Sequence, residues 1–268
     1  MPRMPGPRRR RRFLLWTWLV LFVLLLGGIA MLRVGRHKFD PPAAVRGSVA
    51  GVHGQVSDFF GARTADGKVI LFDAGADPEG RGLDALLGKL GAKREDVTDI
   101  FFTHGHGDHI AAAPLVPKAR LHGGIGDSDM MSKRGPVMPN FARFMGIVLP
   151  VPAVMLTDAF LGKADVPVGG GAAKVVAVPF PGHTPGSMIY LYDGVLFAGD
   201  SMNFEKDKLT AAFAPFSVDT KQNRVNIAAL PTLLPLDDVK VVCTAHGGCT
   251  PESDTRKLLD DLMGKVKG

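Results

Sequence analysis

Cysteine is scarce in this sequence: Cys243 and Cys249 are the only two among 268 residues. Two cysteines are too few for a small scaffold held together by disulfides, although one bridge can form in an oxidising compartment. The sequence leaves open whether the two pair. The chain length suits one large domain with a buried core better than two small ones.

Acidic residues are absent before Asp40, whereas nine of the 32 basic residues precede that position. Without this segment, 23 basic residues stand against 26 acidic ones, a net charge of −3. The pI of about 9.4 therefore reflects the N-terminus and does not indicate a nucleic-acid partner. We expect the remaining chain to bind no nucleic acid.

Charge is also absent from residues 13–32, a 20-residue apolar run. A helix of that length spans about 30 Å, the thickness of a bilayer core. Six arginines precede the run, and the positive-inside rule predicts that residues 1–12 form a basic cytoplasmic tail. The rest would then lie outside the cytoplasm, on the periplasmic side in a bacterium. A cleaved signal peptide, giving a soluble exported protein, is the alternative.

Pro41 and Pro42 favour a linker over residues 33–46, followed by one domain over 47–268. The sequence contains no convincing repeat. Alternating or continuous apolar runs predict strands, and apolar residues at helical spacing predict two helices. The predicted strands are 48–53, 58–62, 69–72, 99–103, 174–179, 188–192, 195–198 and 239–245, and the predicted helices are 82–90 and 252–266. Two halves, each running from sheet to helix, suggest two sheets packed face to face with helices outside.

Residues 123–162 fit neither half. The segment is rich in Met and Phe and is interrupted by prolines, which is typical of an adaptable apolar insert or lid. An ordinary helix and loop covering one edge of a sheet is the alternative.

A dense histidine cluster, Thr103-His104-Gly105-His106-Gly107-Asp108-His109, directly follows a predicted strand. We expect its two glycines to ease a tight turn that lets His104 and His106 converge on one metal. Asp108 and His109 would begin the next helix and face a second metal.

A zinc ion needs three or four ligands, so the cluster requires partners from distant parts of the sequence. His183 lies in a Pro-Gly-His-Thr-Pro-Gly loop, Asp200 ends a predicted strand, and His246 follows another. All three occupy loops at strand ends, where side chains can meet at one edge of a sandwich.

These residues resemble the landmarks of the metallo-β-lactamase superfamily over about residues 48–250. The resemblance implies an α/β (α+β) four-layer αββα sandwich, here preceded by one N-terminal hydrophobic helix. It also implies a site with two Zn²⁺, or Fe or Mn in their place. The first metal would take His104, His106 and His183, the second would take Asp108, His109 and His246, and Asp200 would bridge them. Asp73 would accept a hydrogen bond from a ligand imidazole.

The resemblance implies a metal-dependent hydrolase in which a zinc-activated hydroxide cleaves an ester, lactone or thioester. Asp108, as the catalytic residue, or a metal-bound water is the expected proton carrier to the leaving group. The core is similar to that of glyoxalase II and lactonases, but the 22 residues after His246 leave no room for the former's C-terminal helical domain. The apolar 123–162 segment and a membrane anchor at residues 13–32 would favour a small, amphipathic substrate.

Two other functions remain open at this stage. Sulfur dioxygenases of this fold use a mononuclear iron with a similar ligand set. A membrane-anchored binding module with a vestigial site is the third interpretation. Among the other histidines, we expect His37 and His122 to be structural, and His53 is a candidate for the mouth of the cleft.

Overall fold

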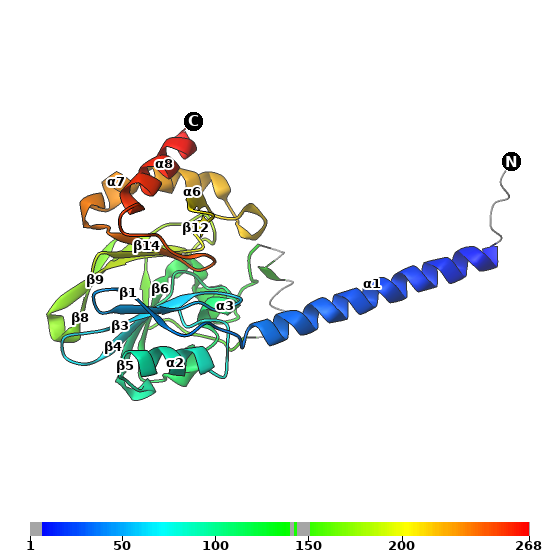
Figure 1. Cartoon of the computed structure of the whole chain (residues 1–268), viewed down its shortest axis with the longest axis horizontal. Coiled ribbons are helices and arrows are strands. Elements are labelled where there is room, and N and C mark those ends of the chain that lie inside the picture. Colours follow the sequence, from blue (N-terminus) through cyan, green and yellow to red (C-terminus); the bar gives the residue numbers. More distant parts are fainter. Residues whose placement is uncertain (1–6, 140–141, 144–150, 268) are drawn as a thin grey trace.

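The computed structural model describes residues 7–139, 142–143 and 151–267. Its first element is α1 (Pro7–Gly35), a long helix that projects away from the rest of the protein (Figure 1). Within it, Leu15–Gly35 is long and apolar enough to cross a membrane, a property that a signal sequence would share. The large apolar side chains from Leu15 to Leu26 are exposed, so this helix does not belong to the core.

The first sheet has seven strands in chain order, from β1 at one edge to β7 at the other. The first four strands are antiparallel neighbours, and β4 to β7 run parallel to one another. The bounds are β1 (Ala43–Arg46), β2 (Val49–Val52), β3 (Phe59–Arg63), β4 (Val69–Phe72), β5 (Val97–Phe101), β6 (Arg120–Gly124) and β7 (Asp158–Phe160).

The second sheet has six strands in the order β15-β14-β11-β10-β9-β8, and β11 and β14 are its parallel pair. A separate two-stranded ribbon, β12 and β13, lies beside it. The bounds are β8 (Ala164–Val168), β9 (Ala173–Pro179), β10 (Met188–Tyr192), β11 (Val195–Gly199), β12 (Met202–Glu205), β13 (Lys208–Ala211), β14 (Val241–Thr244) and β15 (Gly248–Cys249).

Helices cover the outer faces of both sheets (Figure 1). Helix α2 (Arg81–Lys89) packs on the first sheet, while α6 (Thr220–Ala228) and α8 (Thr255–Lys267) pack on the second. Shorter helical turns are α3 (Gly107–Ile110), α4 (Ser128–Met131) and α7 (Leu230–Leu233).

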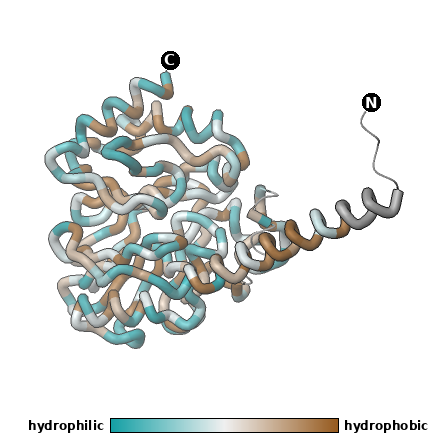
Figure 2. Tube along the Cα trace, turned by 45° about the vertical axis from the view of Figure 1, so that its right-hand side comes forward, coloured by the Kyte–Doolittle hydropathy of each residue, from teal (hydrophilic) through white to brown (hydrophobic). Residues whose placement is uncertain are grey.

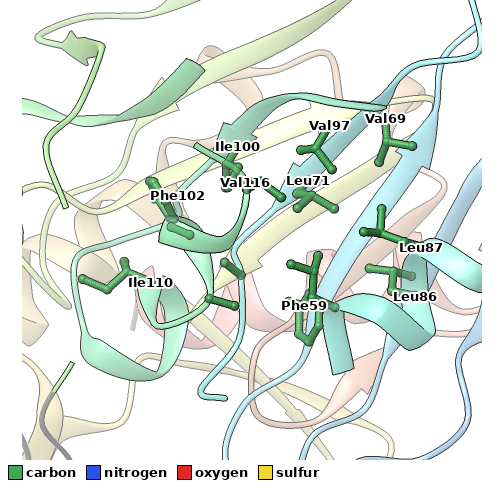
Figure 3. Close-up of a cluster of buried hydrophobic side chains, with 14 of the residues drawn as sticks. Phe59, Val69, Leu71, Leu86, Leu87, Val97, Ile100, Phe102, Ile110 and Val116 are labelled. Carbon is green, nitrogen blue, oxygen red and sulfur yellow. The ribbon is translucent and has the colours of Figure 1, made fainter. Parts of the chain in front are cut away.

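Three buried apolar clusters separate these four layers. The period-2 alternation of strand β4 sends Val69 and Leu71 outward to α2, whose Leu86 and Leu87 meet them (Figure 3). The alternate residues, such as Phe72, face the second sheet, where Phe72 stacks on Phe197 with ring centroids 3.6 Å apart. A third cluster joins the far face of the second sheet to α6 and α8.

The expected sandwich with one N-terminal apolar helix is confirmed. The strands at 69–72 and 188–192 have the predicted bounds, and the other predicted elements differ by one to three residues at their ends. Strand β1 lies inside the segment predicted as a linker, residues 33–46, and pairs with β2, so the sheet begins before residue 47. Helix α6 and strands β6, β8, β12 and β13 were not predicted, because their segments are short or lack regular apolar periodicity.

Helix α4 and strand β7 occupy parts of the predicted insert 123–162. The parallel pairing of β7 with β6 makes this region in part an edge of the first sheet. Residues 140, 141 and 144–150 of the insert, and residues 1–6 of the predicted basic tail, lie outside the described residues.

Candidate metal centre

The candidate site lies at one edge of the sandwich, where parallel strands of both sheets end. In the first sheet, Asp73 follows β4 and His104 comes shortly after β5. In the second sheet, Asp200 follows β11 and His246 comes shortly after β14. Because the carboxyl ends of parallel strands share an edge, residues far apart in sequence meet here.

The first donor group consists of three buried histidines whose ring nitrogens face one another. His104 Nε2 lies 2.9 Å from His106 Nδ1, and His183 Nε2 lies 3.2 Å and 3.1 Å from these two atoms. All three side chains are at most 5% exposed. Three imidazole nitrogens so close together, without a polar group between them, match the spacing of ligands around one cation.

The outer ring nitrogens of this group have protein partners. His106 Nε2 lies 2.8 Å from the carbonyl oxygen of Met138, which can only accept, so that nitrogen carries the proton. His183 Nδ1 is 3.3 Å from the Ser217 hydroxyl, and His104 Nδ1 is 3.2 Å from that of Thr103. These contacts turn the free lone pair of each ring toward the centre.

The second donor group consists of Asp108, His109 and His246, whose ligand atoms lie within 4.8 Å of one another. Asp108 Oδ2 is 3.6 Å from both His109 Nε2 and His246 Nε2. The expected placement of Asp108 and His109 at a helix start is confirmed, because both belong to α3. This group is more open than the first, since the side chain of His246 is 42% exposed.

Asp200 lies between the two groups. Its Oδ2 is 3.4 Å from His183 Nε2 and 3.2 Å from His246 Nε2, and its Oδ1 is 3.5 Å from His109 Nε2. One carboxylate therefore faces donors of both groups, as the family resemblance implied for a bridging ligand.

Asp73 makes the contact that the resemblance implied. Its Oδ2 accepts from His109 Nδ1 at 2.8 Å and from the Thr103 hydroxyl at 2.8 Å, while Oδ1 accepts from the Thr103 amide. The hydrogen bond from His109 to Asp73 places a proton on His109 Nδ1 and leaves Nε2 facing the site. Asp73 has a φ of 62°, a left-handed conformation that these three bonds hold in place.

The pKa shifts separate the two groups. Burial, reinforced by neighbouring histidines, holds the pKa of His104 well below its usual range, and burial lowers the pKa of His183 to about 3. The Asp200 carboxylate raises the pKa of His246 to about 9. For His109, burial lowers the pKa, but Asp73, Asp108 and Asp200 together raise it well above the usual range.

The donor set fits a metal ion on two grounds. Nitrogens bound tetrahedrally at about 2.0–2.1 Å from zinc lie about 3.3 Å apart, close to the spacing within the first group. In addition, His109 Nε2 and Asp200 Oδ1 are buried atoms that lack a hydrogen-bond partner among the described residues. A buried, unpartnered polar atom is costly, and a cation between them would satisfy both.

The two glycines of the cluster act differently from the prediction. Neither Gly105 nor Gly107 has a positive φ, so the turn does not need their conformational freedom. Close packing requires them instead, because a Cβ would lie 2.6 Å from Met131 at Gly105 and 2.8 Å from Val151 at Gly107. The expectation that the glycines provide conformational freedom for the turn was therefore wrong.

Asp127 is a functional candidate that sequence reasoning missed. Its buried carboxylate accepts from the Gly105 amide at 2.8 Å, the Gly186 amide at 2.8 Å and the Thr184 hydroxyl at 2.7 Å. It therefore ties the His104–His106 loop to the His183 loop. Its position just after the carboxyl end of β6 is typical of a site residue, but β6 was not predicted from the sequence.

The remaining histidines lie outside both donor groups. His122 is buried and 2.8 Å from Asp99, and His37 is 2.9 Å from Asp77, as expected for structural residues. His53 is an exposed side chain whose Nδ1 is 2.6 Å from Asp58. Its place at the mouth of the cleft stays a prediction.

The two cysteines form a disulfide, Cys243–Cys249, which pairs β14 with β15. The sequence had left this pairing open. The bridge closes the short hairpin that carries His246, so it restrains the loop of the more exposed donor.

Comparisons with known proteins agree with this geometry. The sequence profile of the Metallo-beta-lactamase superfamily matches residues 62–246. The chain is 24% identical over 240 residues to the uncharacterized protein YobT of Bacillus subtilis, covering 76% of this chain and 88% of that one. It is also 30% identical over 143 residues to a hydroxyacylglutathione hydrolase of Fuscovulum blasticum, covering 52% of this chain but only 44% of that enzyme.

Among solved structures, the class B3 di-zinc metallo-beta-lactamase LRA-12 from an Alaskan soil metagenome aligns with a TM-score of 0.65. The alignment covers 87% of this chain and 94% of that one at 19% identity. A beta-lactamase from Chitinophaga pinensis aligns with a TM-score of 0.63, covering 87% and 93% at 19% identity. At such identities the likeness concerns the fold alone. With the superfamily profile covering the histidine cluster, His183, Asp200 and His246, the chain belongs to the metallo-β-lactamase superfamily and is a metallo-hydrolase of that fold.

Proposed function

We propose that this protein is a dinuclear zinc hydrolase that cleaves an ester, lactone or thioester of a small amphipathic molecule. The observation that carries the proposal is the arrangement of seven donor residues in two groups that share Asp200. We further propose that α1 holds the enzyme on a membrane, with the catalytic domain outside the cytoplasm.

The proposed ligands divide as the two groups do. His104, His106 and His183 would hold one zinc, Asp108, His109 and His246 the other, and Asp200 both. Bound zinc supplies a nucleophile from water at neutral pH and polarises the carbonyl of the substrate.

Residues of the protein would orient the histidine ligands and protonate the leaving group. Asp73 holds the ring of His109 in one orientation, and Asp127 holds the two histidine loops together. Asp108 is the proposed proton carrier to the leaving group, because its side chain belongs to the more open donor group and is 24% exposed.

Metal content separates this function from the alternatives. Protein purified without added chelator or metal should contain two zinc ions per chain and hydrolyse a chromogenic short-chain ester. One iron per chain with oxygen-dependent thiol oxidation would favour a dioxygenase, and absence of any metal would favour a binding module. Either result would overturn the proposal.

A matched pair of variants tests the ligand assignment. His246→Ala should contain one zinc per chain, whereas His53→Ala, which removes another exposed histidine at this edge, should retain two. Equal metal content in the two variants would contradict the assignment of His246.

A further inference from the structure

The helix that can span a membrane joins the domain at the same edge as the metal site. After α1 ends, Phe39 pairs with Gly54, the Asp40 amide donates to the His53 carbonyl at 2.8 Å, and the Gln55 amide donates to that of Lys38. His53, Gly54 and Gln55 belong to the loop that connects β2 to β3. Because β3 is antiparallel to β4, it begins beside the end of β4, from which Asp73 follows. Figure 1 shows α1 leaving the domain on the side of α3.

The same loop also contacts the site. The Ser57 hydroxyl donates to the Asp108 carbonyl at 2.6 Å, and the Asp58 amide donates to the Ala245 carbonyl at 2.7 Å. The Asp58 carboxylate accepts from the Gly248 amide at 2.9 Å, two residues beyond His246. A few residues thus connect the end of the anchor to α3 and to the His246 hairpin.

Large apolar side chains are exposed around the site at this edge. We call them the apolar rim: Ile125, Met138, Leu161, Phe213 and Val218, which are 45%, 38%, 81%, 62% and 40% exposed.

Each member of the apolar rim is placed there by the fold. Ile125 and Leu161 directly follow the carboxyl ends of the parallel strands β6 and β7. Met138 contacts His106 through its carbonyl, and the Val218 amide donates to the His183 carbonyl at 3.0 Å. The Phe213 carbonyl accepts from Ser217, whose hydroxyl also contacts His183.

The opposite edge has a different character. The turn from β3 to β4 exposes Asp66 and Lys68, and the strand ends at the β10–β11 hairpin expose Asp193 and Lys240. Exposed apolar groups that gather at one edge mark an interaction surface. Figure 2 shows that the hydrophobic part of α1 lies between its N-terminal end and the domain.

We infer that the apolar rim rests on the bilayer that α1 spans, so that the metal site opens toward the lipid and takes an acyl-bearing substrate from it. The bilayer is the occupant that the anchor provides, because the helix leaves the domain at the same edge of the sandwich as the rim. The exposed Lys38 at this junction suits the headgroup region, which the long basic side chains near the ends of membrane helices reach. This inference rests on the membrane anchoring in the proposed function.

Tryptophan quenching tests the contact directly. Both natural tryptophans, Trp16 and Trp18, lie in α1, so Trp16→Phe and Trp18→Phe clear the background. In this double variant of the full chain, Phe213→Trp places a reporter on the apolar rim, and Ala65→Trp places a matched reporter on the exposed turn of the opposite edge. Each protein is reconstituted into phosphatidylcholine–phosphatidylglycerol vesicles with brominated acyl chains.

The expected result is loss of more than half of the emission at position 213 and no change at position 65. Emission unchanged at both positions would overturn the inference, as would equal quenching at both, since that indicates unspecific adsorption. Metal content and circular dichroism check that each variant folds.

A substrate comparison separates this inference from the proposed function. Combined Ile125→Ser and Leu161→Ser should lower the ratio of activity on a long-chain ester in vesicles to activity on a soluble short-chain ester by at least fivefold. An unchanged ratio, together with unquenched emission from the reporter at position 213, would overturn the membrane contact and leave the hydrolase proposal standing. Quenching without hydrolysis of either ester would overturn the hydrolase proposal and leave the membrane contact standing.

Discussion

The two donor groups of the candidate metal centre differ in how firmly the protein holds them. The histidines of the first group are buried, their facing nitrogens are 2.9–3.2 Å apart, and each outer nitrogen has a partner in the protein. In the second group, His109 is held by Asp73, but Asp108 and His246 are 24% and 42% exposed. The first group is already arranged as a ligand set, whereas the second depends on one carboxylate and one hairpin.

This difference predicts unequal metal sites. Ligands fixed by packing and by outer hydrogen bonds lose little freedom on binding, and such support raises metal affinity. We therefore expect the first group to bind metal more tightly and the second to respond more strongly to pH and to changes in its surroundings. Four experiments test this comparison.

The largest effect is expected from removing a histidine of the first group. His183→Ala should abolish tight binding of the first metal and lower ester hydrolysis by at least about 100-fold, since the metal contributes several kcal/mol of charge stabilisation. Metal analysis and steady-state kinetics measure both, with His37→Ala as the control, because His37 contacts Asp77 and none of the donor residues. Activity above about a tenth of the wild-type value would contradict the assignment, because loss of a ligand removes much of the metal affinity.

Loss of Asp73 should lower the metal affinity of the second donor group and leave that of the first unchanged. Asp73→Ala removes the bond that orients His109, and such outer bonds contribute about 10- to 100-fold in metal affinity. Competition titration with a chromophoric chelator resolves the two binding events. Equal weakening of both sites would show that Asp73 supports the edge as a whole.

The pH dependence should also differ between the groups. Asp200 raises the pKa of metal-free His246 to about 9, so below that pH a metal at Nε2 must displace a proton. His183, whose pKa burial lowers to about 3, is already neutral. Affinity at the second group should therefore fall by at least about tenfold per unit as pH drops from 8 to 6, while the first stays nearly constant. Equilibrium dialysis across this range would reveal a parallel decline if the comparison is wrong.

The smallest effect concerns the disulfide. Replacing both Cys243 and Cys249 with Ala frees the hairpin that carries His246. Metal binding must then order the His246 side chain, which costs about 0.5–1.5 kcal/mol. We expect affinity at the second group to fall by less than about tenfold and the first group to be unaffected. Calorimetric titration of the double variant measures both, and unchanged binding at the second group would mean that strand pairing alone holds the hairpin.

Sequence patterns placed the candidate donors at strand ends because each pattern is local. The family resemblance implied the hydrogen bond between Asp73 and a ligand imidazole, but the other contacts that support the donors were not predicted. The strands bearing His104, Asp200 and His246 are apolar runs and were readily recognised. Asp127 was missed because it touches its partners only after β6 pairs beside β5. The reason for Gly105 was likewise invisible, since the side chain it must accommodate, Met131, lies 26 positions away.

The division of the donors between the two sheets has a mechanical consequence. His104 and its neighbours follow β5 of the first sheet, whereas Asp200 and His246 follow strands of the second. An ion shared by these donors is an internal cross-link between the halves of the sandwich. Bound only by the folded chain, and at a free concentration 100 times its Kd, it would add about 2.7 kcal/mol to the free energy of unfolding. We therefore expect the metal-free protein to unfold more readily and to be cleaved faster by proteases.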